Sequence, residues 1–330
     1  MTTVAPATWP SAKAAHRLAI GAAASTWLLL LVGGMVHGTG SSLACPDWPT
    51  CYGTFFPEMK GGVFYEHGHR VFAFLIGVLT LCLAFVLFRR RNADPGGKTT
   101  AKLGYLTVFL VCMQGTLGGI TVLFKLPLLV TLAHLTTSMC FFSLMAWVAI
   151  RTAPPRSAGT RSEALARLRP IAGAAALATL AQIIFGGVVR HTHNGLACWS
   201  IPLCDGRALA DQAWPAALGK QLQMGHRYFA VALAALVIGL AVATWRRAVG
   251  EPRTRLLAVL AVALVVVQIA LGLVSVAYSL PLIPVTAHLG VAALILLVHV
   301  SLFATLPPAV RAPSTIEHDA PHAAVFAGGE

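Results

Sequence analysis

Charged side chains are scarce in this chain of 330 residues: Asp, Glu, Lys and Arg together make up 11% of it, and only 11 residues are acidic. Soluble domains carry about 25% charged residues, so this shortage excludes a water-soluble globular protein. The alternating segments of about ten residues that build transmembrane β-barrels are also absent. Long apolar runs are present instead, in a composition that is 57% hydrophobic. Runs of about 20 apolar residues cross a bilayer as helices, so the sequence predicts an all-α integral membrane protein.

The apolar runs predict eight transmembrane helices. They lie near residues 18–37, 69–88, 103–123, 128–150, 170–190, 222–245, 256–278 and 284–305. Most of the 24 Lys and Arg residues fall on one side of these spans, and the other side keeps Lys60, Arg70, Lys125, Arg190, Arg207, Lys220 and Arg227. The positive-inside rule therefore predicts that both termini are cytoplasmic and that the loops 38–66 and 191–220 face outward. The basic residues orient the spans among membrane lipids, and no basic groove with interleaved aromatics indicates a nucleic-acid partner.

The two halves of the chain repeat one another. Gly33–Gly34 recurs as Gly186–Gly187, and a C-x5-C loop follows each pair at the same distance. Four spans per half keep the same orientation, so the sequence predicts two four-helix bundles related by a pseudo-two-fold axis along the membrane normal, as in parallel-repeat membrane proteins. The expected divisions are an N-terminal cytoplasmic tail over 1–16, a first bundle over 17–152, a cytoplasmic linker over 153–169, a second bundle over 170–306 and a C-terminal cytoplasmic tail over 307–330.

Four histidines inside the spans form two repeated pairs. His69 opens the second span and His134 lies about two turns into the fourth, and His226 and His288 repeat this arrangement. Ionisable residues within spans are rare and functional by default, although a lone one can be a hydrogen-bonded core residue. Zinc or copper usually takes three or four protein ligands, and each bundle offers two. A haem iron needs only two axial ligands, so the pairs indicate two haem sites.

The first histidine of each pair has an arginine beside it in both halves, but an acidic neighbour in only one. Arg70 and Arg227 follow it in both, where they are candidates for contacts to haem propionates or for snorkelling to lipid head groups. Glu66 lies one helical turn before His69, whereas the second half has Gln223. A carboxylate there is a candidate base or electrostatic stabiliser; the alternative is a glutamate bonded to lipid or loop backbone. The asymmetry favours chemistry in the first half and a bound cofactor in the second.

Cysteines and further histidines gather on the outer side. Each outer loop holds a C-x5-C pair, Cys45 with Cys51 and Cys198 with Cys204, that can close a disulfide in an oxidising compartment. Such a pair is either a loop staple or a redox pair. We expect the remaining cysteines, inside the spans, to be small core residues, and His67 to be a loop or rim residue. The group His37, His191 and His193 lies at outer span ends, as a polar entrance or as surface residues.

The combination of these motifs resembles the heme A synthase family. The matching elements are the ACPDWPTCYG loop, E-x-x-H-R at 66–70, His134 in TLAHL, His226 in GHR and His288 in TAHL. The resemblance implies a membrane oxidoreductase that oxidises the C8 methyl group of heme O to a formyl group, giving heme A for the terminal heme-copper oxidase.

The same resemblance implies a role for each site residue. His226 and His288 are expected to ligate a cofactor haem b, His69 and His134 to hold the substrate haem, and Glu66 to be the catalytic carboxylate. The expected partners are heme O, heme O synthase and oxidase assembly factors, in a bacterial inner membrane. The rival hypothesis is a di-haem b-type electron carrier that exchanges electrons with quinone, against which the Glu66 and Gln223 asymmetry argues.

Overall fold

The computed structural model describes residues 12–93, 96–154, 163–204 and 218–308, and this part of the chain is almost entirely helical. The helices are α1 (Ala12–Gly38), α2 (Gly61–Arg89), α3 (Gly97–Leu123), α4 (Leu128–Thr152), α5 (Glu163–Ala166), α6 (Arg169–His191), α7 (Leu218–Arg247), α8 (Pro252–Ala277) and α9 (Leu282–Thr305). Within the described ranges, eight segments are long and apolar enough to cross a membrane, with α5 and α6 forming one of them over Glu163–His191. The predicted multi-pass all-α membrane protein is confirmed.

Several helices begin earlier than the spans predicted from the apolar runs. The 29 residues of α2 extend about 44 Å at 1.5 Å per residue, which exceeds the hydrocarbon thickness of about 30 Å. The excess lies at the N-terminal end of the helix, predicted to be the outer one, where residues 61–68 precede the predicted span. His69 therefore lies in the third turn of α2 and does not open it, and Glu66 belongs to the helix as well.

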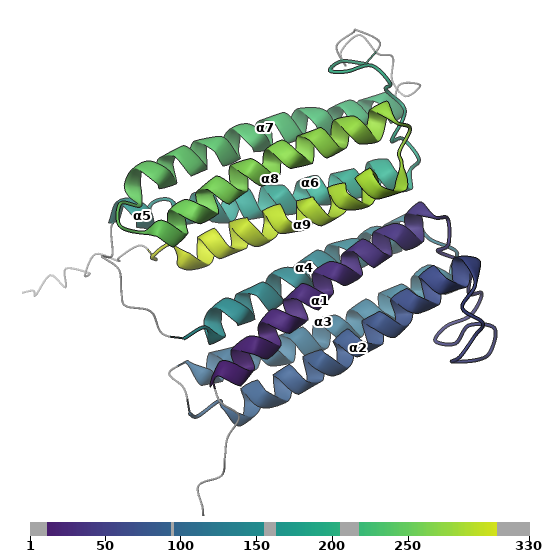
Figure 1. Cartoon of the computed structure of the whole chain (residues 1–330), viewed down its shortest axis with the longest axis horizontal. Coiled ribbons are helices and arrows are strands. Elements are labelled where there is room, and N and C mark those ends of the chain that lie inside the picture. The colour runs from purple at the N-terminus through teal and green to yellow at the C-terminus, as the bar shows by residue number, and fades with distance from the viewer. Residues whose placement is uncertain (1–11, 94–95, 155–162, 205–217, 309–330) are drawn as a thin grey trace, which may run out of the picture.

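The helices pack as two bundles of four, α1–α4 and α6–α9 (Figure 1). Each helix contacts its neighbours in chain order, and the first contacts the fourth in both bundles. Contacts between the bundles run through α1 with α9, α4 with α6 and α4 with α9. If α1 corresponds to α6 and α4 to α9, the first two contacts are equivalent, so the packing fits the predicted pseudo-two-fold relation.

Glycines at the interface between the bundles repeat in the same way. Gly34 of α1 packs against Thr286 and Leu289 of α9, and Gly187 of α6 packs against Leu132 and Leu135 of α4. Small residues let membrane helices approach closely, because van der Waals packing drives helix association where lipid is as apolar as the side chains. The repeated glycines thus have a structural reason: each makes room for a leucine of the other bundle.

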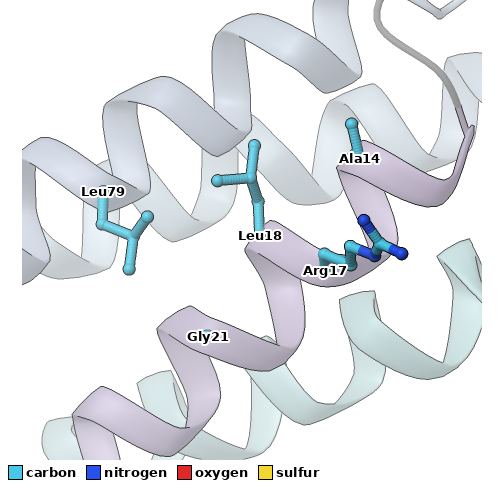
Figure 2. A pocket seen from close by; sticks show the side chains of 5 residues that line it. All are labelled: Ala14, Arg17, Leu18, Gly21 and Leu79. Carbon is cyan, nitrogen blue, oxygen red and sulfur yellow. The ribbon is translucent and has the colours of Figure 1, made fainter.

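A surface hollow and three free cysteines lie away from the loops that hold the disulfides. A hollow lies beside the N-terminal half of α1, lined by Ala14, Arg17, Leu18, Gly21 and Leu79 (Figure 2), and none of the predicted site residues lines it. The free cysteines Cys82, Cys112 and Cys140 are exposed on the helices. The expectation that they are core residues is wrong, because these helices turn much of their apolar surface outward.

Candidate functional site

Each of the four predicted histidines lies with its ring against a glycine of the preceding helix. A Cβ added to any of these glycines would come within 3.0–3.3 Å of the histidine Cε1 atom, closer than ordinary van der Waals contact. The pairs are Gly33 with His69, Gly118 with His134, Gly186 with His226 and Gly272 with His288. The same cradle therefore occurs four times, and a side chain at any of the glycines would displace the ring.

The two histidines of each bundle lie close enough to interact electrostatically, His69 with His134 and His226 with His288. Their second ring nitrogens differ between the bundles. In the first bundle the Nδ1 atoms of both histidines are buried without a hydrogen-bond partner. In the second, the Nδ1–H of His288 donates to the carbonyl of Gln268 at 3.1 Å.

The remaining histidine, His226, is also held in place in the second bundle. The side-chain amide of Gln182 lies 3.1 Å from its Nδ1 and donates to its backbone carbonyl at 2.8 Å. The corresponding residue of the first half is Leu29, which has no hydrogen-bonding group. In the first bundle Gln114 donates likewise to the backbone carbonyl of His134, at 3.0 Å, so the difference between the bundles lies at the Nδ1 atoms of the histidines.

These residues fit a haem group better than a bare metal ion. A histidine whose Nδ1–H donates to a carbonyl keeps the Nε2 lone pair for a metal, and this is the usual arrangement of metal-bound histidine. Neither pair has a third protein ligand, since the one group of three potential ligands found among the described residues is Cys45, Cys51 and His67. Zinc would require that third ligand, whereas a haem brings four nitrogens itself and takes two histidines.

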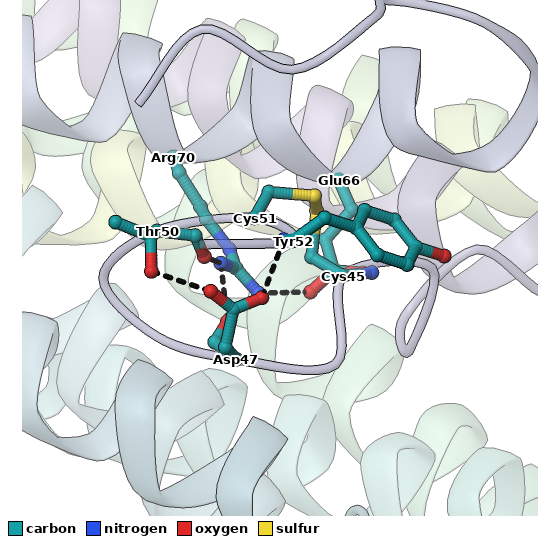
Figure 3. Close-up of polar contacts among 7 residues, drawn as sticks. All are labelled: Cys45, Asp47, Thr50, Cys51, Tyr52, Glu66 and Arg70. Carbon is teal, nitrogen blue, oxygen red and sulfur yellow. Dashed lines mark hydrogen bonds and ion pairs between the residues drawn. A yellow bond between two sulfur atoms is a disulfide. The ribbon is translucent and has the colours of Figure 1, made fainter. Parts of the chain in front are cut away.

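Two interactions hold the side chain of Glu66, one of them with the first loop, residues 39–60 (Figure 3). Its side chain is buried, with 4% of the residue exposed. One carboxylate oxygen accepts a hydrogen bond from the backbone N–H of Cys45 at 2.8 Å, and the other lies 2.5 Å from the guanidinium of Arg70. The sequence left a functional carboxylate and a loop-bonded glutamate open. The structure shows a buried carboxylate on α2, bonded to the backbone of the loop and one helical turn from His69.

The two arginines that follow the first histidines bind loop carbonyls. Arg70 donates to the carbonyls of Asp47 at 2.8 Å and Thr50 at 2.6 Å in addition to its ion pair. In the second bundle Arg227 donates to the carbonyls of Cys198, Ser200 and Pro202 at 2.8–3.1 Å. Both guanidinium groups thus anchor an outer loop to a helix, and contacts to haem propionates stay a prediction.

Gln223 takes the structural place of Glu66 in the second bundle. Its amide oxygen accepts the backbone N–H of Cys198, as Glu66 accepts that of Cys45, and its amide N–H donates to the carbonyl of Gly195 at 2.7 Å. An amide is therefore sufficient to hold the loop. The negative charge of Glu66 is what the first bundle has in addition.

Asp47 organises the exposed tip of the first loop. Its carboxylate accepts hydrogen bonds from the Thr50 hydroxyl and from the backbone N–H groups of Tyr52 at 2.7 Å and Gly53 at 2.9 Å. These hydrogen bonds, the Thr50 bond foremost, lower the pKa of Asp47 below its ordinary value because they favour the ionised form. The loop tip therefore stays ordered at neutral pH.

Both predicted disulfides are present, Cys45–Cys51 and Cys198–Cys204. His67 adjoins the first of them, because a ring nitrogen lies within 4.8 Å of both sulfurs and the side chain is buried with 5% exposed. The expectation of a rim residue is therefore wrong: Nε2 of His67 donates to the Phe55 carbonyl at 3.0 Å and ties the first loop to α2.

Trp48 is a contact that the sequence analysis missed. Its indole ring lies on Gly119 of α3, where an added Cβ would meet ring carbons at 2.8–3.0 Å. The next residue along α3 on the inner side is Gly118, which cradles His134. The first loop therefore crosses the outer end of its bundle from α2 to α3. Comparison of the two halves could have indicated this contact, because Ile201 and Leu273 replace Trp48 and Gly119 at the corresponding positions of the second half.

Comparison with known proteins gives one consistent result. The pattern of a family described as cytochrome oxidase assembly protein matches residues 57–300. A protein of Shewanella oneidensis named heme A synthase is 29% identical over 314 residues, covering 84% of this chain and 92% of the relative. A protein of the same name from Symbiobacterium thermophilum is 31% identical over 271 residues, covering 79% and 85%, and one from Bacillus pumilus is 31% identical over 217 residues, covering 62% and 67%.

Proposed function

The chain belongs to the heme A synthase family of cytochrome oxidase assembly proteins, and from this premise we propose that it oxidises the C8 methyl group of heme O to the formyl group of heme A. The observation that carries the proposal is the repeated cradle of one glycine and one histidine, which gives each bundle two axial ligands. The names of the relatives favour this synthase over a di-haem electron carrier.

In this proposal the two bundles divide the work. The first bundle, over residues 17–152, holds the substrate heme O between His69 and His134. The second, over 170–306, holds a b-type haem between His226 and His288. When bound, that haem supplies one-electron redox chemistry. The polar partners at the Nδ1 atoms of His226 and His288 suit a permanent cofactor, and the unpartnered Nδ1 atoms of the first pair suit a group that enters and leaves.

Glu66 is the proposed catalytic carboxylate. Arg70 and the Cys45 N–H fix its orientation before substrate binds, so no reorganisation is needed when positive charge or an acidic proton develops beside it. Because the protein excludes water from this carboxylate, its charge acts more strongly than on a solvated surface. Gln223 keeps the loop contact without the charge, so the second bundle carries no corresponding activity.

Membership of the family also suggests the cellular location and the partners of this protein. We expect a bacterial inner membrane, with both termini in the cytoplasm and the two disulfide-closed loops in the oxidising compartment. Heme O is the expected substrate, delivered by heme O synthase, and oxidase assembly factors are expected to accept the product.

The test is to identify the pigments that the purified protein makes. The chain is expressed in a bacterium that contains heme O synthase and lacks its own heme A synthase, and extracted haems are separated by chromatography. Heme A, or a hydroxylated precursor, is the expected new pigment, and a His69→Ala variant is the matched control that should make neither. Extracts that contain only haem B, together with a normal low-spin spectrum, would support the electron carrier and refute the synthase.

A further inference from the structure

We propose that Arg190 binds a carboxylate of the cofactor haem in the second bundle; this inference rests on the proposed function. Arg190 lies at the outer end of α6, which contributes the glycine cradle of His226. Gly186 and Arg190 are four residues apart, so they share one face of the helix. Arg190 is therefore about 6 Å further along α6 than the glycine on which His226 packs, and its guanidinium lies beside the end of α1, where the two bundles meet.

Arg190 is a half-buried cation with no counter-charge beside it in the described part of the chain. Its side chain makes neither a hydrogen bond nor an ion pair within the described part of the chain, and its Nη2 lies 3.8 Å from the position that a Cβ would take at Gly38 of α1. Its neighbours are His37 and His191, whose ring centroids are 4.7 Å apart. A guanidinium removed from water and surrounded by neutral or cationic groups is costly unless an anion pairs with it.

The two other arginines at this end of the described chain are already engaged. Arg70 donates to Glu66 and two carbonyls of the first loop, and Arg227 donates to three carbonyls of the second. Arg190 keeps its donors, and a planar guanidinium matches a carboxylate through two parallel hydrogen bonds. Haem carries two propionates. Among the groups expected inside this bundle, they are the carboxylates available to pair with Arg190.

The first half lacks this cation. With Val36 aligned to Val189, the residue corresponding to Arg190 is His37, which is a weaker and pH-dependent cation. Arg190 thus gives the second bundle an anchor for an acidic group that the first bundle does not have. This difference is the one expected between a retained cofactor and a substrate that must be released.

The experiment measures haem loss from the purified holoprotein in nanodiscs. Excess apomyoglobin captures released haem b, and the rate is read from its absorption. Because a charge-assisted hydrogen bond is strong but this one is half-exposed and partly screened, Arg190→Gln should release haem about 10-fold faster. Arg190→Lys should be intermediate, and Arg167→Gln, which removes an exposed arginine paired with Glu163, should equal the wild type.

A second arm identifies the anion. The emptied site is refilled with haem b or with haem b dimethyl ester, whose propionates carry no charge. We expect Arg190→Gln to accelerate the loss of haem b and leave the loss of the ester unchanged. Equal acceleration of both would show a packing role and overturn the inference, as would an unchanged rate for haem b. A wild-type rate set by the anionic lipid content of the nanodisc would assign Arg190 to a lipid phosphate and overturn it too. Wild-type protein without a bound low-spin haem would instead refute the proposed function itself.

Discussion

Replacing Glu66 by Gln separates the charge of this residue from its structural contact. Gln223 already performs the contact in the second bundle, where its amide oxygen accepts the N–H of Cys198. The amide in a Glu66→Gln variant can accept the N–H of Cys45 in the same way. The disulfide-closed loop should therefore remain attached to α2, and the variant should fold and keep the haem of the second bundle.

The magnitude follows from what the substitution removes. Arg70 loses its carboxylate partner but keeps the carbonyls of Asp47 and Thr50, so the structural cost is about one charge-assisted hydrogen bond, roughly 1.5–3 kcal/mol. The chemical loss is larger, because a positioned base or electrostatic group contributes about 10²–10⁴ in rate. We expect heme A production to fall by that factor while heme O or a partly oxidised intermediate accumulates.

The assay compares the ratio of heme A to heme O in extracts with the low-spin spectrum of the purified protein. Glu58→Gln is the matched control, because Glu58 is an exposed carboxylate of the same loop, paired with Lys60, and it should behave as the wild type. Gln223→Glu should not create a second active site, because the haem in that bundle is the cofactor. A normal yield of heme A from Glu66→Gln would make this residue a loop anchor only and remove the main support for divided roles.

Four further outcomes are expected. His288→Ala should remove the low-spin haem spectrum, and an unchanged spectrum would contradict its role as a ligand. Gly186→Ala should disturb the same spectrum, because its Cβ would lie 3.0 Å from Cε1 of His226, whereas Gly239→Ala, with open space around it, should not. Alkylation of unreduced protein followed by mass spectrometry should leave all four loop cysteines unlabelled; labelling there would count against the disulfides. Because its hydrogen bonds lower the pKa of Asp47, their contribution to loop order should persist above the ordinary aspartate pKa and weaken as pH falls through the lowered one, as followed by the rate of disulfide reduction with a phosphine.

The number of helices and the positions of the histidines could be predicted because both depend on local properties of the chain. A span requires about 20 apolar residues in sequence, and a repeat preserves the spacing of its members whatever the fold. The glycines of the cradles could also be found in the sequence, since Gly33 and Gly186 recur together with the histidines. Their role depends on the contact between two helices, which no single run of residues specifies.

The partners of the arginines and of His67 could not be predicted, because they depend on the path of a loop. Arg70 and Arg227 bind backbone carbonyls, and every residue of a loop offers such an acceptor. Sequence therefore reveals the donors but not the acceptors. The same reason hid Arg190, whose significance lies in the absence of a partner among the described residues.

The differences between the halves cluster at the outer end of the bundles, which bears on where the chemistry takes place. In the alignment of the two halves Glu66 corresponds to Gln223, Trp48 corresponds to Ile201, and His37 corresponds to Arg190. All three first-half residues lie on the first loop or on the helix ends beside it. The glycine cradles, by contrast, are the same in both bundles. A duplicated frame that keeps its glycines and histidines while residues at one end differ is what divergence of function at that end would produce, and this agrees with the proposal that one bundle alters its haem and the other retains it.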